Sequence, residues 1–395
     1  MTNKKILAGI SCAELFELIP DKLIRNLEQE TKVNHQVKKL SGDLMLKTLL
    51  FSLLNSEKAS LRIIENLCES VPFKMLTRKQ NLKVKRTAIA ERMANVNYIF
   101  FERIFEVLYA KFSPLLKNQQ GQKDISRYDS TLVSLSAKLL SFGMQRDEER
   151  KMLKFTIGLK NSLPSDVKFF KEQSEISEEL ALKEAILSSK HTKNSIVVFD
   201  RGLQNRKTFA RFTQKRITFI TRLKSRLNFK QVKIHKKVEG QKTATLRLKK
   251  DLIVKLKDES GRWTDTQFRL ITANAISDNT ELPFLTNNLD LTAKEVTNLY
   301  KKRWDIEVFF KFLKQELNFK HWISRTENGI KVMLYATLIL TLLLIVFKER
   351  NRIAGYKIAK LKFAIELEAE LIKEIIVRCG GDVTKFFGSK SLYPK

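Results

Sequence analysis

Residues 300–314 read YKKRWDIEVFFKFLK, and their spacing is the strongest indication of the fold. At about 3.6 residues per turn, the spacing predicts one helix with four polar side chains on the same side as Glu307. Those four side chains belong to Tyr300, Arg303, Lys311 and Lys314. A carboxylate among a phenol and three cations is typical of a surface that handles phosphate. The alternative is an ordinary solvated helix face, in which Glu307 pairs with cations four residues away.

The chain carries a large excess of positive charge. It contains 74 Lys and Arg against 43 Asp and Glu, a formal net charge of +31. Residues 201–257 hold 19 of those basic residues and only Glu239 and Asp251 as acids, so over half of the excess falls there. Such an excess indicates a polyanionic partner, for which nucleic acid is the default candidate, and no segment has the pattern of a basic membrane anchor.

The basic segment itself has strand patterns. Its runs ITFITRLK, TATLRLKK and LIVKLK alternate or are rich in β-branched residues, which predicts antiparallel strands. A basic sheet of this kind can neutralise several backbone phosphates, and its binding would be strongly salt-dependent. The alternatives are disorder or a merely solvated surface.

Cysteine, histidine and hydropathy patterns exclude several kinds of site. The three cysteines, Cys12, Cys68 and Cys379, lie far apart and argue against a disulfide framework or a zinc knuckle, and the four histidines show no ligand spacing. Residues 332–347 are almost entirely apolar, but 16 residues span only about 24 Å of a hydrocarbon core about 30 Å thick. We therefore expect a buried helix there and no membrane partner.

The order of predicted elements changes after residue 120. Residues 1–120 show helical periods, and within them a basic run at 81–104 is compatible with a DNA-reading helix or with an ordinary packed one. Beyond Gly121, three strand patterns precede the helix ISEELALKEAILSSK. The strand SIVVFDRG, the helix NRKTFARFTQK and the strand ITFITRLK then follow. This β-β-β-α-β-α-β order predicts an α/β core.

Two aspartates lie at chemically suggestive positions in that order. Asp129 lies in the first strand, and Asp200 ends the fourth. If those strands are neighbours, the two carboxylates come together, and with Glu307 they would supply the hard oxygen ligands that Mg²⁺ prefers. The alternatives are that each aspartate is a turn or cap residue, and that Asp124 takes the place of Asp129.

The three acid motifs resemble those of the DDE transposases of the bacterial insertion-sequence-four family. That family's signature has Tyr, two residues, Arg, three residues, Glu, six residues and Lys, and residues 300–314 match it in full. YDST at Asp129 and FDRG at Asp200 resemble the other two motifs. Leu203 follows FDRG where the family often has an aromatic residue, which makes the second motif the less complete one.

The resemblance implies an α/β catalytic core of the ribonuclease-H-like type, with a mixed sheet and helices. In such a core, Asp129, Asp200 and Glu307 would be the catalytic acids and would bind two Mg²⁺ ions, for which Mn²⁺ can substitute. The phosphates at the element's end would be held by Tyr300, Arg303 and Lys314. Lys311 is a further candidate phosphate contact.

A flipped base needs an aromatic platform, and Trp263, in the β-rich insertion at residues 226–284, is our candidate for it. The alternative is that Trp263 packs within the small sheet.

Domain boundaries follow from the same resemblance. We expect a helical DNA-binding domain at 1–120, the first part of the catalytic core at 121–225 and a basic β-rich insertion at 226–284. The second part of the core, with the Glu307 helix, is expected at 285–350 and a helical C-terminal region at 351–395.

Cut-and-paste transposition is the activity that the resemblance implies. The chain would bind the terminal inverted repeats of an insertion sequence, cleave the ends by two-metal phosphoryl transfer through a hairpin, and join them to target DNA. Its partners would be double-stranded DNA and a second copy of itself in the paired-end complex, and its location the cytoplasm, on the nucleoid when bound. The alternatives are an inert DNA-binding repressor and a nuclease that joins nothing.

Overall fold

The computed structural model describes residues 10–17, 19–116, 124–136, 142–145, 147–148, 150–175, 177–192, 195–224, 228–319 and 322–383. The chain divides into two compact units. We call Met1–Lys117 with Lys311–Lys395 the helical unit, and Asn118–Phe310 the sheet unit. The five segments expected above, and the boundaries between them, remain a prediction.

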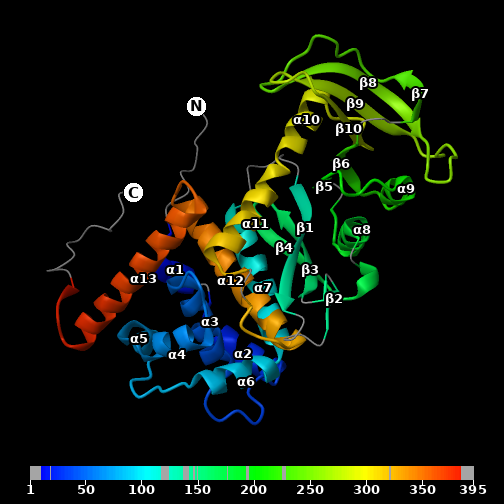
Figure 1. Cartoon of the computed structure of the whole chain (residues 1–395). Coiled ribbons are helices and arrows are strands. Elements are labelled where there is room, and N and C mark those ends of the chain that lie inside the picture. The colour runs from blue at the N-terminus through cyan, green and yellow to red at the C-terminus, as the bar shows by residue number, and fades with distance from the viewer. Residues whose placement is uncertain are drawn as a thin grey trace. The chain divides into compact units, whose positions relative to one another are not determined.

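The helical unit contains helices from both ends of the chain (Figure 1). Its α-helices are α1 (Cys12–Glu17), α2 (Asp21–Glu30), α3 (Gly42–Asn55), α4 (Leu61–Glu69), α5 (Val71–Thr77), α6 (Arg86–Asn95), α7 (Tyr98–Phe112), α12 (Glu327–Arg350) and α13 (Tyr356–Arg378), with a 3₁₀ turn at Ser113–Leu116. Several begin at residues whose side chains accept a bond from the first turn, which fixes where each helix starts. These N-caps are Ser41, Ser60, Ser70 and Asn97.

Helix α12 forms the core of this unit. It is apolar on all sides and packs against α3, α6, α7 and α13. The expected buried helix is confirmed, but it is longer than the 16-residue apolar run on which the membrane argument depended: α12 has 24 residues. By length and composition it is the one helix among the described residues that could cross a membrane, but 94% of its apolar window is buried inside the protein. Burial, not length, identifies it as a core helix.

The sheet unit is built on one ten-stranded sheet. The strands are β1 (Asp124–Ser136), β2 (Met144–Gln145), β3 (Arg150–Lys160), β4 (Leu163–Phe170), β5 (Ser195–Phe199), β6 (Thr218–Arg222), β7 (Phe229–Ile234), β8 (Leu246–Leu256), β9 (Phe268–Ala275) and β10 (Glu281–Thr286). The helices are α8 (Glu178–Ser188), α9 (Arg206–Gln214), α10 (Ala293–Lys301) and the first part of α11 (Trp304–Glu316), with a 3₁₀ turn at Gln173–Glu175.

Strand order confirms the expected α/β class. The sheet runs β2-β3-β1-β5-β6-β10-β9-β8-β7, and β4 pairs with β3 on the same edge as β2, farther along the strand. Strand β3 is antiparallel to β1, whereas β5 is parallel to β1 and β6 is parallel to β5. The first and fourth strands of the expected order, β1 and β5, are therefore neighbours. The basic β7–β10 strands are antiparallel and continue the same sheet, because β10 pairs with β6.

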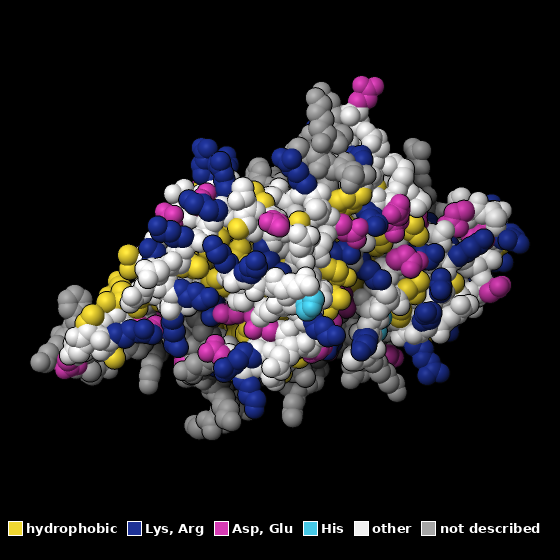
Figure 2. Space-filling model, turned by 90° about the horizontal axis from the view of Figure 1, so that it is seen from below, with side chains coloured by type: hydrophobic (Ala, Val, Ile, Leu, Met, Phe, Trp, Pro, Cys, Tyr) yellow, Lys and Arg dark blue, Asp and Glu magenta, His cyan; other side chains and the backbone are white. Residues whose placement is uncertain are grey.

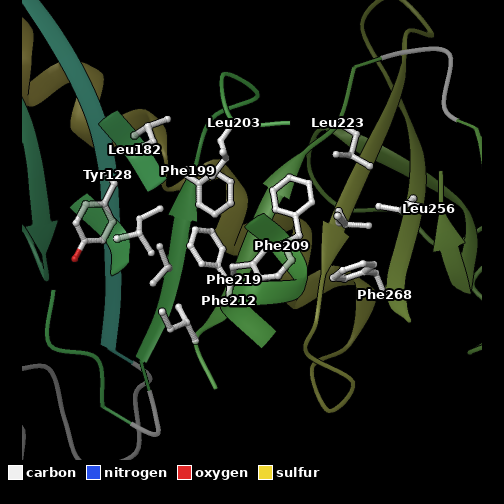
Figure 3. Packing of buried hydrophobic residues seen from close by; sticks show 14 of the residues in the cluster. Tyr128, Leu182, Phe199, Leu203, Phe209, Phe212, Phe219, Leu223, Leu256 and Phe268 are labelled. Atoms are coloured by element: carbon white, nitrogen blue, oxygen red, sulfur yellow. The ribbon is translucent and has the colours of Figure 1, made fainter. Parts of the chain in front are cut away.

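Helices cover both faces of the central strands. Alternate residues of β5 enter different cores: Val197 and Phe199 face α8 and α9, whereas Ile196 and Val198 face α10. Figure 3 shows the first of these cores, in which rings such as Phe209 and Phe219 stack at 5.4 Å between centroids. Both faces of β5 are thus fixed by packing, which also fixes where that strand ends.

One expected pair of strands is a single strand. The runs TATLRLKK and LIVKLK flank Asp251, and both belong to β8, with a register shift between Leu248 and Lys250. An aspartate normally interrupts a strand. Here its carboxylate is fully buried against the guanidinium of Arg269 on β9, at 2.7 Å, so the strand continues through it.

Candidate active site

The two aspartates singled out by the sequence lie side by side. In the parallel pairing of β1 with β5, Tyr128 is level with Phe199, so Asp129 and Asp200 occupy the next position on each strand. The Ser130 amide donates to Oδ1 of Asp129 at 2.8 Å, and the Gly202 amide donates to Oδ1 of Asp200 at 2.7 Å. The strand order alone therefore brings the two carboxylates to one edge of the core.

A third carboxylate, which the sequence analysis missed, lies beside them. Glu178 stands in the first turn of α8, and a Cβ built on Gly202 would lie 2.9 Å from its Oε1 and 2.8 Å from Oδ1 of Asp200. Gly202 of the FDRG motif is therefore needed because a larger residue would push these two acids apart. An acid in the first helical turn is so common that no pattern in the sequence distinguishes Glu178 from an ordinary helix-start residue.

The clustered acids disturb one another's titration. Burial raises the pKa of Asp129 to about 7, and the charges of Asp200 and Glu178 act in the same direction, against the Ser130 amide and Arg303. Burial and the charge of Asp200 also raise the pKa of Glu178. Bringing carboxylates together without an equal number of cations costs free energy, which a divalent cation bound among them would offset.

Helix geometry around Glu307 differs from the expected single stripe. The predicted continuous helix was wrong: α10 ends at Lys301, Lys302 and Arg303 form a turn, and α11 begins at Trp304. Amide-to-carbonyl bonds in the turn span three residues, as from Ile306 to Arg303 at 3.2 Å. Tyr300, Arg303 and Glu307 therefore come from one helix, the turn and the next helix.

Glu307 is bound to Arg303 and does not lie in the carboxylate cluster. Nη2 of Arg303 lies 2.6 Å from Oε1 of Glu307. The Arg303 side chain is nearly buried, and that of Glu307 is about one third exposed. Among the described residues, no group of three or more His, Cys, Asp and Glu side chains is arranged to hold a metal ion. The donor chemistry still suits Mg²⁺, because the carboxylates of Asp129, Asp200 and Glu178 are hard oxygen ligands whose charges act on one another. Glu307 is connected to them through its ion pair with Arg303.

The Arg303 turn nevertheless belongs to the same site. The charges of Asp129 and Asp200 both act on Arg303, and Asp200 also acts on the buried phenol of Tyr300, whose pKa is raised by that burial. The Arg303 guanidinium carbon lies 6.0 Å from the ring centroid of Tyr300 and 5.9 Å from that of Trp304. The structure therefore brings both aspartates together with Tyr300, Arg303 and its partner Glu307.

Arg127 joins the aspartate strand to this turn. Its side chain is buried on β1, two residues before Asp129, and its Nε donates to the Lys302 carbonyl at 2.7 Å. Its Nη2 lies 2.9 Å from the carboxylate of Asp305. In an unbroken α-helix the Lys302 carbonyl would accept a hydrogen bond from the Ile306 amide. Here it accepts from the Asp305 amide at 3.1 Å, and the Ile306 amide donates to the Arg303 carbonyl instead.

Three further predicted contacts lie on α11 and on the connection between β8 and β9. Lys311 is exposed and Lys314 is half-buried, both on the second part of α11, which belongs to the helical unit. Trp263 is 45% exposed on the connection between β8 and β9, and its backbone forms an isolated antiparallel β-bridge with that of Lys257. In the part of the chain that the structure describes, no recorded interaction links Trp263 to either aspartate. Asp124 bonds to Lys160 and Asn161, as a structural residue would.

Basic side chains cover the outer strands of the sheet unit. We call the following exposed residues the basic platform: Lys230, Lys233, Lys236, Lys237, Lys242, Arg247, Lys249, Lys250 and Lys257. None of them forms an ion pair with a carboxylate among the described residues, whereas helical-unit cations such as Lys47 and Lys331 do. Figure 2 shows Lys and Arg side chains spread over the face that it presents. Unpaired cations on one platform suit a polyanion.

Comparisons with known proteins agree with this site. The family described as "Transposase DDE domain" matches residues 123–343, which include both aspartates and Glu307. A protein of Synechocystis described as a transposase for insertion sequence element IS4SA is 24% identical over 62% of this chain and 66% of its own length. A Geobacillus stearothermophilus protein, described as a transposase for element IS5377, is 22% identical over 65% and 66%. The chain thus spans just under two thirds of the length of these curated relatives.

Proposed function

Because the chain belongs to the transposase DDE domain family and is of the insertion-sequence-four kind, we propose that it is a cut-and-paste transposase. It binds the terminal inverted repeats of an insertion sequence, cleaves the ends by phosphoryl transfer through a hairpin, and joins them to target DNA. The observation that carries this proposal is the level register of Asp129 and Asp200 on neighbouring parallel strands, beside the Arg303 turn.

Asp129, Asp200 and Glu307 would hold two Mg²⁺ ions, with Mn²⁺ as a substitute. When bound, the ions activate a water or a DNA 3′-hydroxyl and stabilise the leaving oxygen of an in-line displacement. The carboxylates supply position and charge and form no covalent intermediate. For Glu307 to join the two aspartates, its side chain must leave Arg303, to which it is bound at 2.6 Å.

Release of Glu307 gives Arg303 a second role. A guanidinium that loses a carboxylate partner can grip a phosphate with two parallel donors. Tyr300 lies within reach of the same phosphate, since its ring is stacked close to Arg303. We propose that DNA entry exchanges the partner of Arg303 from Glu307 to a backbone phosphate, with Lys314 and Lys311 as further contacts and Trp263 as the stacking platform for a flipped base.

Assembly and location follow from the same function. Both ends of an element have to be cut in one complex, so we propose a homodimer on double-stranded DNA. A protein that acts on bacterial DNA works in the cytoplasm, on the nucleoid. The buried state of α12 agrees with a protein that has no membrane partner.

A cleavage assay tests the proposal. The full chain is incubated with Mg²⁺ and a duplex that ends in the inverted repeat found beside the coding sequence. We expect nicked strands, hairpin ends and joined products. Nicks without hairpins or joined products would indicate a nuclease only, and binding without cleavage would indicate an inert DNA-binding protein.

Salt dependence tests the basic platform. Replacing Lys249 and Lys250 with Ala should weaken binding to end and random DNA about equally, because phosphate contacts carry no sequence information. The slope of log K against log salt should fall by about 1 for each lost contact. Lys168→Ala, an exposed lysine on β4, is the matched control and should leave the slope unchanged. An unchanged slope in the double variant would place the DNA elsewhere.

Arg127 tests how the Arg303 turn is positioned. Arg127→Met removes both contacts to the turn, so we expect the cleavage rate to fall about tenfold or more through misplacement of Arg303 and Glu307. The melting temperature should fall by only a few degrees, because Asp305 remains more than half exposed to solvent. Arg211→Met, an exposed arginine of α9 outside the basic platform, is the matched control. An unchanged cleavage rate would show that other contacts position the turn.

A further inference from the structure

Glu178 is a charged residue of the site to which the three acid motifs give no role. It is exposed in the first turn of α8, and in the part of the chain that the structure describes no hydrogen bond or ion pair holds its carboxylate. Glu307, in contrast, is bound to Arg303 at 2.6 Å. In the protein without DNA, Glu178 is therefore the more available of the two acids.

A buried lysine holds the start of α8 against the sheet. Lys154 lies on β3, and its Nζ donates at 3.2 Å to the carbonyl oxygen of Glu175, in the 3₁₀ turn that precedes α8. The charges of Lys154 and Glu178 also act on each other. Because a buried ammonium group is costly unless polar groups meet it, this contact fixes the chain that leads to Glu178.

A second contact joins the first turn of α8 to the loop that follows Asp200. Oε1 of Glu179 accepts from the amides of Gln204 and Asn205, at 3.3 and 2.5 Å. Asn205 is also the N-cap of α9, so the loop is fixed at both of its ends. Glu178, the neighbour of Glu179, is thereby held beside the second acid motif.

Gly202 shows how close Glu178 and Asp200 are. A Cβ at this position would lie 2.7 Å from the carboxyl carbon of Glu178 and 2.8 Å from Oδ1 of Asp200, closer than real Cβ contacts come. Gly202 is not among the glycines with a positive φ, so the space between the two acids, and not the backbone, requires glycine here. Two carboxylates this close repel each other unless a cation lies between them.

Glu178 is also the acid that can move. Asp129 and Asp200 are each held by an amide bond, from Ser130 and Gly202. No three acids in the described part of the chain are already arranged to hold a metal ion. The exposed side chain of Glu178 can turn toward the two aspartates, and three hard carboxylates would then face one cation.

We propose that, in the protein without DNA, Glu178 holds a divalent cation together with Asp129 and Asp200. Glu307 joins these acids only after a DNA phosphate has replaced it on Arg303, so the first ion is bound before DNA enters. This role of Glu178 rests on the ion chemistry proposed above and adds its first step. Mn²⁺ binding tests it without a cleavage reaction, so each of the two proposals can fail alone.

Mn²⁺ binding to the full chain without DNA is measured by electron paramagnetic resonance, which detects the unbound ion. We expect the wild type to bind Mn²⁺, and Glu178→Gln to raise the dissociation constant by at least about tenfold. Glu307→Gln should change it by less than about twofold, because Glu307 is bound to Arg303. Glu184→Gln, an exposed acid farther along α8, is the matched control. Circular dichroism checks that each variant folds.

Gly202→Ala tests the close approach without removing a charge. The added methyl group has to push Glu178 and Asp200 apart, so we expect Mn²⁺ to bind at least about tenfold more weakly in the absence of DNA. Because the φ angle of Gly202 suits alanine, the melting temperature should fall by only a few degrees. Mn²⁺ binding of unchanged strength in this variant would contradict an ion held between the two acids.

Two further results would overturn the role of Glu178. One is a wild type that binds Mn²⁺ only when an end duplex is present. The other is binding without DNA that Glu307→Gln weakens as much as Glu178→Gln does. A wild type that binds Mn²⁺ through Glu178 but cleaves no end duplex would instead support this role and contradict the proposed transposition.

Discussion

Asp129→Asn, Asp200→Asn and Glu307→Gln each lower the Mg²⁺-dependent cleavage rate of an end duplex by at least about 1,000-fold, while DNA binding stays close to that of the wild type. The amide keeps the size of each side chain but removes its negative charge, so the pair of ions is no longer held. Folding should survive, because Asp200 lies just beyond the end of β5 and the charge of Asp129, within β1, is already costly to bury. Gel assays of cleavage and of band shift measure the two properties separately.

Glu281→Gln is the matched control for this set. Its carboxylate is exposed at the start of β10 in the same unit, so the variant should cleave at the wild-type rate. Undiminished cleavage in all three acid variants would contradict the assignment of the triad. Loss of cleavage together with loss of folding in any one variant, seen by circular dichroism, would instead assign that acid a structural role.

Arg269→Ala should destabilise the sheet unit by about 3–5 kcal/mol, the largest stability effect that we expect. Arg269 is fully buried, with Nε and Nη2 at 2.9 and 2.7 Å from the two oxygens of Asp251. Its Nη1 also donates to the carbonyl oxygens of Asn288 and Leu291, at 3.3 and 2.5 Å. Removal of the guanidinium leaves a buried carboxylate and two carbonyls without this partner.

The consequence should extend beyond the outer strands. Asn288 and Leu291 lie on the connection from β10 to α10, and α10 precedes the Arg303 turn and Glu307. Arg269 therefore links the outer strands of the basic platform to the segment that positions Glu307. Thermal unfolding of the variant should occur on the order of 10 °C lower, and DNA affinity and cleavage should fall together. Arg247→Ala removes an exposed arginine of β8 and should leave the melting temperature within about a degree. A variant as stable as the wild type would show that Asp251 is neutralised in another way.

The aspartate pair could be predicted because the order of the strands along the chain can be deduced from their hydrophobic patterns. Asp129 follows an apolar-alternating run, Asp200 ends the run SIVVF, and the helix between the strands permits a parallel crossover. The parallel register of β1 and β5 confirms that the two strands are neighbours. Hydrophobic periodicity therefore predicted that both aspartates, 71 positions apart, belong to strands, whereas the adjacency of those strands was a condition of the prediction that the structure supplies.

Tertiary contacts decided what periodicity could not. The break between α10 and α11 contains neither Gly nor Pro, and it depends on Arg127 reaching the Lys302 carbonyl from a strand far away in the sequence. Strand β8 runs through Asp251 because Arg269 on another strand neutralises it. In both cases a buried arginine from a distant part of the sequence changes the structure that local propensity predicts, a continuous helix in one case and a strand break in the other. No local sequence pattern indicates where that guanidinium will lie.

Glu307 marks the limit of motif-based prediction. The motif implied that it joins the two aspartates, whereas in the structure it is bound to Arg303, and Glu178 is the carboxylate beside them. The spacing of residues 300–314 shows which side chains belong together, because Arg303 and Glu307 are indeed partners. It does not show which partner each side chain takes when DNA and metal ions are present.

The most direct test is a crystal structure of the full chain with an end duplex and Mn²⁺, using anomalous scattering to locate the ions. We predict two manganese peaks bound by the carboxylates of Asp129, Asp200 and Glu307, with Arg303 turned from Glu307 to a DNA phosphate. Manganese bound without Glu307 while the Arg303–Glu307 ion pair persists, or ions away from both aspartates, would contradict the account.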